Sequence, residues 1–153
     1  MSKCSHRGQV VTVGKYEILA GGIYYLQPKD IFKADIVIAL TPVPQELNVR
    51  EILFYDWPDL EPPPEDFEQF LQSEVIPALE AGKKVLVFCA GGHGRTGTFL
   101  ACLLALLEPE IEDPVAEIRR RYCLKAVETP EQAAAVMSLR QHLLNQPANA
   151  AGN

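Results

Sequence analysis

The stretch VLVFCAGGHGRTG, residues 85–97, decides the fold of this chain. It begins with a short apolar run, Val85–Phe88, which is typical of a buried strand. A cysteine follows, then five residues, then arginine and threonine, and four of the nine residues from Cys89 to Gly97 are glycines. A strongly apolar helical pattern continues over Phe99–Leu107. This order predicts a strand, a loop large enough to surround a phosphate, and the N-terminus of a helix.

The predicted loop is suited to binding an oxyanion. Three of its glycines leave the backbone free to turn successive N–H groups inward, and such groups form an anion-binding nest. The following helix adds the positive end of its dipole at the same point. Arg95 can donate two parallel hydrogen bonds to the anion and remains charged. We therefore expect a phosphate or a similar group to bind against Ala90, Gly91, Gly92, His93, Gly94 and Arg95.

Cys89 lies at the base of this positive field. N–H donors, a helix N-terminus and a guanidinium all stabilise a thiolate, so we expect Cys89 to be a nucleophile toward phosphorus. The Thr96 hydroxyl can donate a hydrogen bond to the sulfur and stabilise it as the leaving group of a second step. A buried cysteine beside a glycine-rich turn is the alternative without chemistry, but it does not explain C-x5-R-T-G between an apolar strand and an apolar helix. A Walker-A loop is excluded, because Cys89 stands five residues before Gly94 and Arg95 replaces the lysine.

The pattern C-x5-R-T-G resembles the signature loop of the cysteine-dependent protein phosphatases, the tyrosine and dual-specificity type. The resemblance implies hydrolysis of phosphotyrosine through a phospho-cysteine intermediate, with no metal and no cofactor. Phosphoserine and phosphothreonine are further substrates if the pocket is shallow. The compact dual-specificity-like branch fits better, because we recognise no tyrosine-gripping N-terminal loop. Family members usually have histidine before the cysteine, whereas this chain has Phe88, which leaves the nucleophilicity of Cys89 open.

A proton donor is needed as well, because the leaving alkoxide or phenoxide must be protonated. A carboxylic acid on a nearby loop can supply this proton and then remove one from the attacking water. Trp57-Pro58-Asp59 resembles the mobile acid loop of the tyrosine phosphatases, and Asp59 stands 30 residues before Cys89. The resemblance therefore assigns the general acid to Asp59, with Asp56 as the reserve candidate. Without the tripeptide, both aspartates would be interpreted as turn residues.

The segment AVETPEQ, residues 126–132, resembles the glutamine-bearing segment of compact family members. The resemblance implies that Gln132 positions the water that hydrolyses the phospho-enzyme; a polar residue in the first turn of a helix is the alternative. Arg119–Arg121 precede this segment, and they either form a solvated helix face or contact the substrate or the acid loop. His93 points either to the rim of the pocket or to the outer wall of the loop.

The composition is that of one globular domain. The chain has 153 residues, 48% hydrophobic and 22% charged, and a formal net charge of −6. We expect a flexible N-terminus over residues 1–8, a phosphatase domain over 9–146 and a disordered tail over 147–153. The negative charge and the absence of a signal peptide or long apolar segment predict a cytoplasmic protein with no nucleic-acid or membrane partner. We expect a monomer that acts on phosphorylated protein.

The four cysteines show no metal-binding spacing. Cys4, Cys89, Cys102 and Cys123 include no C-x2-C pair, so no zinc site is expected. Reduced thiols are the default for a cytoplasmic protein. Cys102 lies in the apolar helical pattern, where we expect it to be a core residue rather than a resolving thiol for oxidised Cys89. A redox role of Cys123 is left open.

Strands alternate with helices along the chain. Four prolines over residues 58–64 interrupt any regular element. The pattern predicts an α/β fold: a single domain with a central, mostly parallel sheet of four to five strands flanked by helices, as in the protein tyrosine phosphatases. The acid loop and the cysteine loop both follow strands, so they can meet at one edge of the sheet. Strands are predicted at 9–13, 16–20, 23–25, 35–40, 51–55 and 85–88, and helices at 28–33, 64–81, from the cysteine loop to 107, at 114–122 and at 129–145.

Three other functions compete with a protein phosphatase. The first is a non-catalytic phosphate-binding module, whose cysteine is a poor nucleophile because of Phe88. The second is the same chemistry on a phosphoinositide or an RNA 5′-phosphate, although His93 is the one basic residue among positions 90–94. The third is a sulfur transferase or arsenate-reducing enzyme, which does not explain Trp57-Pro58-Asp59 together with Gln132.

Overall fold

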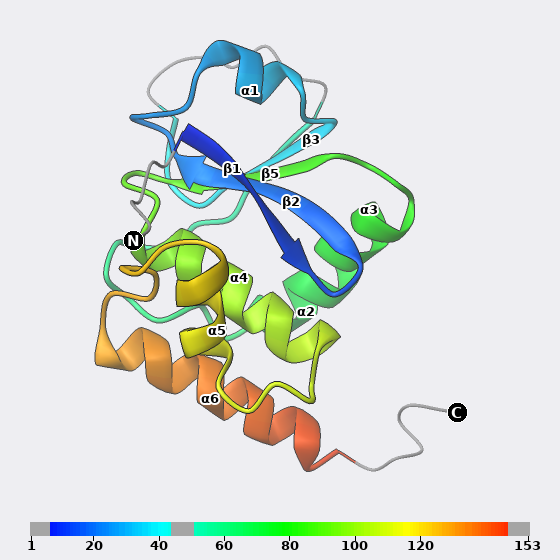
Figure 1. Cartoon of the computed structure of the whole chain (residues 1–153), viewed down its shortest axis with the longest axis vertical. Helices are drawn as coiled ribbons and strands as arrows, with labels where there is room; N and C mark the ends of the chain where they lie inside the picture. The colour runs from blue at the N-terminus through cyan, green and yellow to red at the C-terminus, as the bar shows by residue number, and fades with distance from the viewer. Residues whose placement is uncertain (1–6, 44–50, 147–153) are drawn as a thin grey trace.

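Five strands form one sheet in the part of the chain that the structure describes (Figure 1). The structure is a computed structural model, and it describes residues 7–43 and 51–146. The strand order in the sheet is β1-β2-β5-β3-β4. The strands are β1 (Arg7–Val13), β2 (Tyr16–Gly22), β3 (Ile36–Ala39), β4 (Ile52–Phe54) and β5 (Val85–Cys89).

Strand β5 lies at the centre of this sheet. It pairs in parallel with β2 on one side and with β3 on the other, and β4 extends the parallel part beyond β3. Strand β1 runs antiparallel to β2 in a hairpin. All residues of β5 are buried, as expected for a strand covered on both faces. The predicted, mostly parallel α/β sheet is confirmed, and its parallel strands bring the loops that follow them to one edge.

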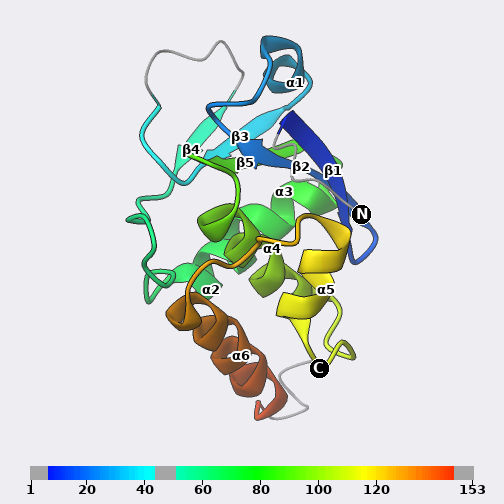
Figure 2. The same ribbon diagram turned by 60° about the vertical axis from the view of Figure 1, so that its left-hand side comes forward.

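Helices cover both faces of the sheet (Figures 1 and 2). On one face lies α1 (Pro28–Phe32), where Ile31 packs in a cluster with Leu86 and Phe88 of β5. The opposite face is covered by α4 (Gly94–Leu107), which is buried throughout its first twelve residues. A helix that is apolar on all sides belongs in the interior. The outer layer consists of α5 (Pro114–Arg121) and α6 (Pro130–Leu144), which pack against α4.

The helix predicted at residues 64–81 is divided into three consecutive segments. They are α2 (Phe67–Phe70), a π-helical turn (Leu71–Val75) and α3 (Ile76–Glu80). Pro77 explains the division, because it has no N–H to donate to Ser73 and its ring would crowd that carbonyl in a regular helix. The wider π-helical turn ahead of Pro77 relieves this crowding.

Two details of the predicted elements have different outcomes. Gly82 follows α3 with a φ of 81°, in the left-handed region that glycine often adopts just beyond a helix C-terminus, which agrees with the end of the helix predicted at residues 64–81. The short strand predicted at Ile23–Tyr25 is wrong: these residues form a turn, in which the Tyr25 N–H donates to the Gly22 carbonyl at 2.9 Å. The turn is needed because the chain leaves the sheet here to enter α1. The expected terminal segments fall largely on residues 1–6 and 147–153, which lie outside the described residues.

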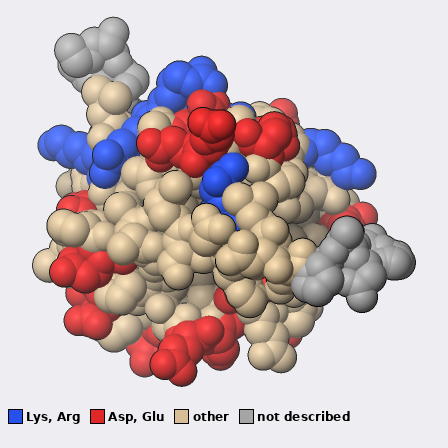
Figure 3. Space-filling model, turned by 90° about the horizontal axis from the view of Figure 1, so that it is seen from below, with Lys and Arg blue, Asp and Glu red and all other residues tan. Residues whose placement is uncertain are grey.

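One face of the molecule carries charged side chains of both signs around its margin (Figure 3). Seen from below, acidic side chains lie in separate groups around a broad area without charged side chains (Figure 3). Among the described residues, no helix combines the length and the apolar character that crossing a membrane would require.

Candidate active site

Cys89 is the last residue of β5 and is fixed by its neighbours. It pairs in register with Gly22 of β2, and the Ile23 N–H donates to its carbonyl at 2.8 Å. The residue is 3% exposed. Its sulfur accepts a hydrogen bond from the Gly92 N–H, with a nitrogen–sulfur distance of 3.2 Å. This N–H stabilises negative charge on the sulfur, as a nucleophile requires.

The loop after Cys89 turns tightly over the end of β2. Gly92 has a φ of 86°, in the left-handed region that favours glycine. At Gly22, a side-chain Cβ would come within 2.6 Å of the Gly91 carbonyl carbon, so the loop can pass only because residue 22 is glycine. Sequence reasoning missed this role. The signal that could have revealed it is the Gly21-Gly22 pair at the end of a predicted strand.

Tyr122, just after α5, supports the loop from outside and was also missed. Its hydroxyl donates to the Gly92 carbonyl at 2.7 Å, and its side chain is buried. Burial, reinforced by the nearby Cys89, raises the pKa of Tyr122 far above its usual range, so the hydroxyl keeps its proton. No local pattern marks a tyrosine in this role, because its partner is 30 residues away in the chain.

Arg95 is the buried cation of the loop, with 5% of its surface exposed. Its Nη1 donates to the carbonyl of Leu40 at 3.2 Å and to that of Trp57 at 2.9 Å. Its Nε is buried and has no hydrogen-bond partner among the described residues. An unsatisfied buried donor costs about 1–3 kcal/mol. The guanidinium is therefore held on one side and left ready for an anion on the other.

Asp59 is the aspartate that approaches this cation. Its Oδ1 lies 3.6 Å from the Arg95 Nε, and its side chain is 67% exposed. Asp56 is exposed too, but within the described part of the chain neither a hydrogen bond nor an ion pair joins it to the loop. The geometry thus favours Asp59 over Asp56. Its role as general acid stays a prediction.

Backbone contacts hold the acid loop, residues 56–64, in this position. The buried Trp57 donates from its Nε1 to the Glu61 carbonyl at 2.8 Å, and its ring meets the edge of Phe67 with the centroids 5.1 Å apart. The Thr129 hydroxyl donates to the Leu60 carbonyl at 3.4 Å. The loop is therefore folded on its own tryptophan and attached to the start of α6.

Gln132 makes the second attachment to α6. Its Nε2 donates to the Glu61 carbonyl at 3.1 Å, while its Oε1 accepts from the N–H groups of Glu128 at 2.9 Å and Thr129 at 3.2 Å. The Thr129 hydroxyl accepts from the Gln132 N–H, which completes a capping box. The same Oε1 lies 3.2 Å from the position of a Cβ on Gly94. Gln132 thus connects both loops, and its water-positioning role stays a prediction.

Two further predicted residues lie at the loop with partners of their own. The Thr96 hydroxyl donates to the Gly21 carbonyl at 3.3 Å, so its role toward the Cys89 sulfur stays a prediction. His93 precedes α4, and its Nδ1 lies 3.5 Å from the Cys123 sulfur, which places the ring toward the outer wall of the loop.

His93 is neutral at neutral pH. Removal of its ring from water lowers the pKa of His93; Lys125 adds to the effect, and the carboxylate of Glu128 opposes it. The ring therefore adds no positive charge to the loop at neutral pH.

The other cysteines differ from one another. Cys102 is a buried free thiol in α4, and burial raises its pKa far above the usual range, which confirms the expected core position. Cys123 is disulfide-bonded, contrary to the expectation of reduced thiols. Within residues 7–43 and 51–146, no group of three or more His, Cys, Asp or Glu side chains could hold a metal ion.

The three consecutive arginines all have partners within the protein. Arg120 and Arg121 both pair with Glu117 on the same helix, which corresponds to a helix-surface network. Arg119 donates to two backbone carbonyls just before Glu128. It braces the segment that leads to α6, a use that differs from both alternatives, a solvated helix face and a contact with the substrate or the acid loop.

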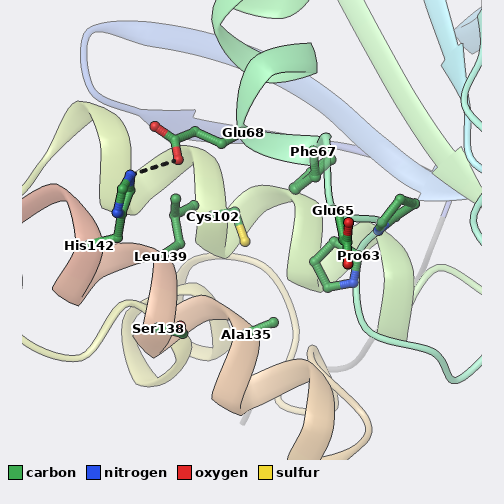
Figure 4. Close-up of a pocket in the computed structure, with 10 residues that line it drawn as sticks. Pro63, Glu65, Phe67, Glu68, Cys102, Ala135, Ser138, Leu139 and His142 are labelled. Carbon is green, nitrogen blue, oxygen red and sulfur yellow. Dashed lines mark ion pairs between the residues drawn. The ribbon is translucent and has the colours of Figure 1, made fainter.

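A separate hollow of about 380 Å³ lies between the end of the acid loop, α2, α4 and α6 (Figure 4). An ion pair between His142 Nε2 and Glu68 Oε1, 3.6 Å apart, lies at one side of it. The Cys102 sulfur faces this space, and none of the predicted site residues lines it. The hollow is therefore distinct from the loop around Cys89, which is the candidate active site. The hollow is lined by Pro63, Pro64, Glu65, Phe67, Glu68, Cys102, Ala135, Ser138, Leu139 and His142.

Comparison with known sequences finds a family match over the part of the chain that contains Cys89, Arg95 and Gln132. The family model described as a Swiss Army Knife protein, DSP-PTPase phosphatase domain (PTP-SAK), matches residues 61–149. The uncharacterized protein MJECL20 of Methanocaldococcus jannaschii is 50% identical over 56 residues, which are 37% of this chain and 37% of that protein. The match thus spans little more than a third of this relative.

Comparison with solved structures supports the fold. Tk-PTP in its active form superposes with a TM-score of 0.68 at 24% identity, over 86% of this chain and 96% of that one. Kinase associated phosphatase superposes with a TM-score of 0.73 at 16% identity, over 92% of this chain and 98% of that one. PTPMT1 in complex with PI(5)P superposes with a TM-score of 0.64 at 17% identity, over 88% of this chain and 94% of that one. Similarity at these identities concerns the fold.

Proposed function

Because the chain belongs to the DSP-PTPase phosphatase domain family of the Swiss Army Knife proteins, we propose that it hydrolyses phosphotyrosine in proteins. Phosphoserine and phosphothreonine are further proposed substrates. The reaction passes through a phosphate bound covalently to Cys89 and needs no metal. The proposal includes a monomer that acts in the cytoplasm on phosphorylated protein.

One observation carries the proposal: the nucleophile and an incompletely bonded cation share one loop. The Cys89 sulfur accepts the Gly92 N–H at 3.2 Å, while the Arg95 Nε is buried without a hydrogen-bond partner among the described residues. A phosphate bound at the loop would give this Nε an acceptor. The Asp59 carboxylate, 3.6 Å from the same Nε, is then close enough to reach an oxygen of the substrate.

The proposed reaction has two steps. In the first, the Cys89 thiolate attacks phosphorus, the bond to the leaving oxygen breaks, and Asp59 protonates that oxygen. In the second, water attacks the phospho-cysteine, Asp59 takes the proton from the water, and the Cys89 thiolate leaves. The assigned roles of Gln132 and Thr96 are to position the water and to stabilise the leaving sulfur. Stabilisation of the transition-state charge by the loop N–H groups and Arg95 is expected to be the largest contribution.

A phosphoinositide or an RNA 5′-phosphate is the second candidate substrate class, and PTPMT1, of the same fold, was solved in complex with PI(5)P. Such polyanions call for additional cations at the loop. Positions 90–94 offer only His93, which is neutral at neutral pH because its pKa is lowered. This observation favours phosphorylated protein.

The test compares the wild-type chain with Cys89→Ser on a phosphotyrosine peptide and a generic aryl phosphate. We expect Cys89→Ser to abolish turnover, and rapid acid quenching of the wild-type reaction to trap phosphate on Cys89, detected by mass spectrometry. Cys102→Ala is the matched control, because it removes a thiol of the same chain away from the loop. Full turnover by Cys89→Ser would refute the mechanism.

A non-catalytic module is tested in the same samples. In that case, wild-type protein binds phosphate but shows no turnover, and alkylation of Cys89 rises only at alkaline pH, as for an ordinary thiol. This outcome would support the non-catalytic module, in which Phe88 before Cys89 leaves the thiol a poor nucleophile.

A further inference from the structure

The short turn before α6 has an unusual backbone. Val127 has a φ of 66°, in the left-handed region. A β-branched side chain rarely adopts this conformation, which costs on the order of 1–3 kcal/mol. The surrounding structure must therefore hold the turn in place. Strain of this kind is often found where a neighbouring side chain needs an exact position.

Three hydrogen bonds hold the strained turn. Arg119 donates from Nε to the Ala126 carbonyl and from Nη2 to the Val127 carbonyl, both at 2.8 Å. The Val127 N–H donates to the His93 carbonyl at 3.3 Å. This last bond joins the turn directly to the loop of residues 89–95, the nucleophile loop. The next residue, Glu128, is thereby brought against the start of α4.

The Glu128 side chain lies against the nucleophile loop. Its Oε1 is 2.5 Å from the position that a Cβ on Gly94 would occupy. Gly94 is the first residue of α4, where the helix dipole and free N–H groups attract anions. Glu128 is exposed, and the described residues include no ion-pair partner for it. A negative charge thus stands beside a site built for negative charge.

The Glu128 carboxylate has no part in the capping of α6. The capping box uses the backbone N–H of Glu128, which donates to the Gln132 Oε1, and the side chains of Thr129 and Gln132. Replacing the carboxylate by an amide therefore leaves that box in place. Within the protein the carboxylate acts on His93, whose pKa it raises, and its position beside Gly94 also directs it toward the ligand.

We propose that Glu128 is a specificity-determining residue that makes the loop reject phosphate groups carrying further negative charge close by. The proposal rests on the function proposed above and narrows its substrate class to isolated phosphomonoesters with an uncharged leaving group, such as phosphotyrosine. A single phosphate is held by Arg95 and the loop N–H groups in spite of Glu128. A second phosphate beside the first meets the carboxylate, and positions 90–94 contain no Lys or Arg to balance it.

The test measures binding, so that it does not depend on turnover. Calorimetry on Cys89→Ser protein gives the affinities for inorganic phosphate and for pyrophosphate, with and without Glu128→Gln. We expect Glu128→Gln to strengthen phosphate binding about threefold and pyrophosphate binding about tenfold or more, since the second phosphate adds charge near the carboxylate. The gain should decrease as salt is raised.

Glu131→Gln is the matched control. Glu131 lies in the first turn of α6, three residues after Glu128, and its replacement by Gln changes the net charge by the same amount. We expect the ratio of pyrophosphate to phosphate affinity to stay within twofold of that of the parent protein. An equal change in both variants would overturn the proposal and indicate a general charge effect.

The outcomes separate the two proposals. If phosphate binds but Glu128→Gln leaves the pyrophosphate-to-phosphate ratio unchanged, the specificity role is refuted and the phosphatase proposal stands. If neither Cys89→Ser nor the wild-type chain binds phosphate, both proposals fail. In the wild-type background, Glu128→Gln should also raise kcat/KM for an inositol bisphosphate relative to a phosphotyrosine peptide.

Discussion

The nucleophile loop, residues 89–95, and the acid loop, residues 56–64, lie at the same edge of the sheet but are held differently. The nucleophile loop joins the central strand to a buried helix, and its Cys89 and Arg95, the proposed nucleophile and anion-binding cation, are 3% and 5% exposed. The acid loop lies on the surface, and the Asp59 side chain is 67% exposed. Three hydrogen bonds, to the carbonyls of residues 57, 60 and 61, attach it to α4 and α6.

The difference in how the two loops are held corresponds to the tasks proposed for them. A nucleophile and its anion site gain from fixed geometry, because donors that are already in position need no reorganisation during the reaction. Displacing them would disturb β5 and α4 together. Releasing the acid loop breaks three hydrogen bonds, each worth about 1 kcal/mol net. Apart from the buried Trp57, the acid loop is therefore held mainly by these three bonds, whereas the nucleophile loop is held by β5 and α4 together.

The largest expected effect tests whether the acid loop contributes Asp59 rather than Asp56. Asp59→Asn should lower kcat at least about 100-fold, because a positioned general acid contributes that much or more. Asp56→Asn is the matched control and should retain most of the activity. Steady-state kinetics on an aryl phosphate with a poor leaving group checks both variants. The reverse ranking would transfer the acid role to Asp56.

An intermediate effect is expected where the acid loop is attached. Gln132→Leu removes the bond to the Glu61 carbonyl and leaves the N–H groups of Glu128 and Thr129 without their acceptor. We expect kcat to fall about tenfold and the free energy of unfolding to fall by about 2 kcal/mol. Urea unfolding and initial rates measure the two effects.

Gln141→Leu serves as the control for Gln132→Leu. Gln141 lies on the same helix, and its amide nitrogen donates to the exposed Asn145 at 3.1 Å. Its replacement should change neither the rate nor the stability appreciably. A fully active Gln132→Leu protein would show that the attachment to α6 is dispensable for the acid loop.

The smallest effect is expected where the nucleophile loop is supported from outside. Tyr122→Phe removes the bond to the Gly92 carbonyl, so the free energy of unfolding should fall by about 1 kcal/mol. The kcat/KM should fall only about threefold, because β5 and α4 still fix the loop. Tyr16→Phe, at the start of β2 and away from the site, is the control. A loss as large as that of Asp59→Asn would contradict the rigidity of the nucleophile loop.

Much of the fold followed from local patterns. The apolar run before Cys89, the prolines after Asp56 and the helix-starting sequence at Thr129 each act within a few residues, so their strand, loop and helix are confirmed. The predicted strand at Ile23–Tyr25 is wrong, although its residues favour strands. The reason is tertiary, because the chain must turn there to place α1 over the sheet.

The residues of the candidate site likewise fall into those that local sequence predicts and those that depend on tertiary contacts. The chemistry of the nucleophile loop could be predicted from residues 89–96, since its N–H groups, cation and thiol are close in the chain. Tyr122 and Glu128 could not be predicted, because their partners in the loop are separated from them by long stretches of sequence. At Gly22 the Gly21-Gly22 pair was a signal, but it did not show which loop passes over it. The roles of all three residues depend on how the folded chain places their segments against residues 91–94.

By itself, the sequence determined that an anion-binding loop with a cysteine joins a buried strand to a buried helix. Only the tertiary structure decided that Asp59 rather than Asp56 approaches Arg95, that Gln132 joins the acid loop to α6, and that a strained turn places Glu128 beside Gly94. The physical reason is distance along the chain. A local motif specifies its own backbone, whereas contacts between remote segments arise only when the core packs and brings the strand ends together.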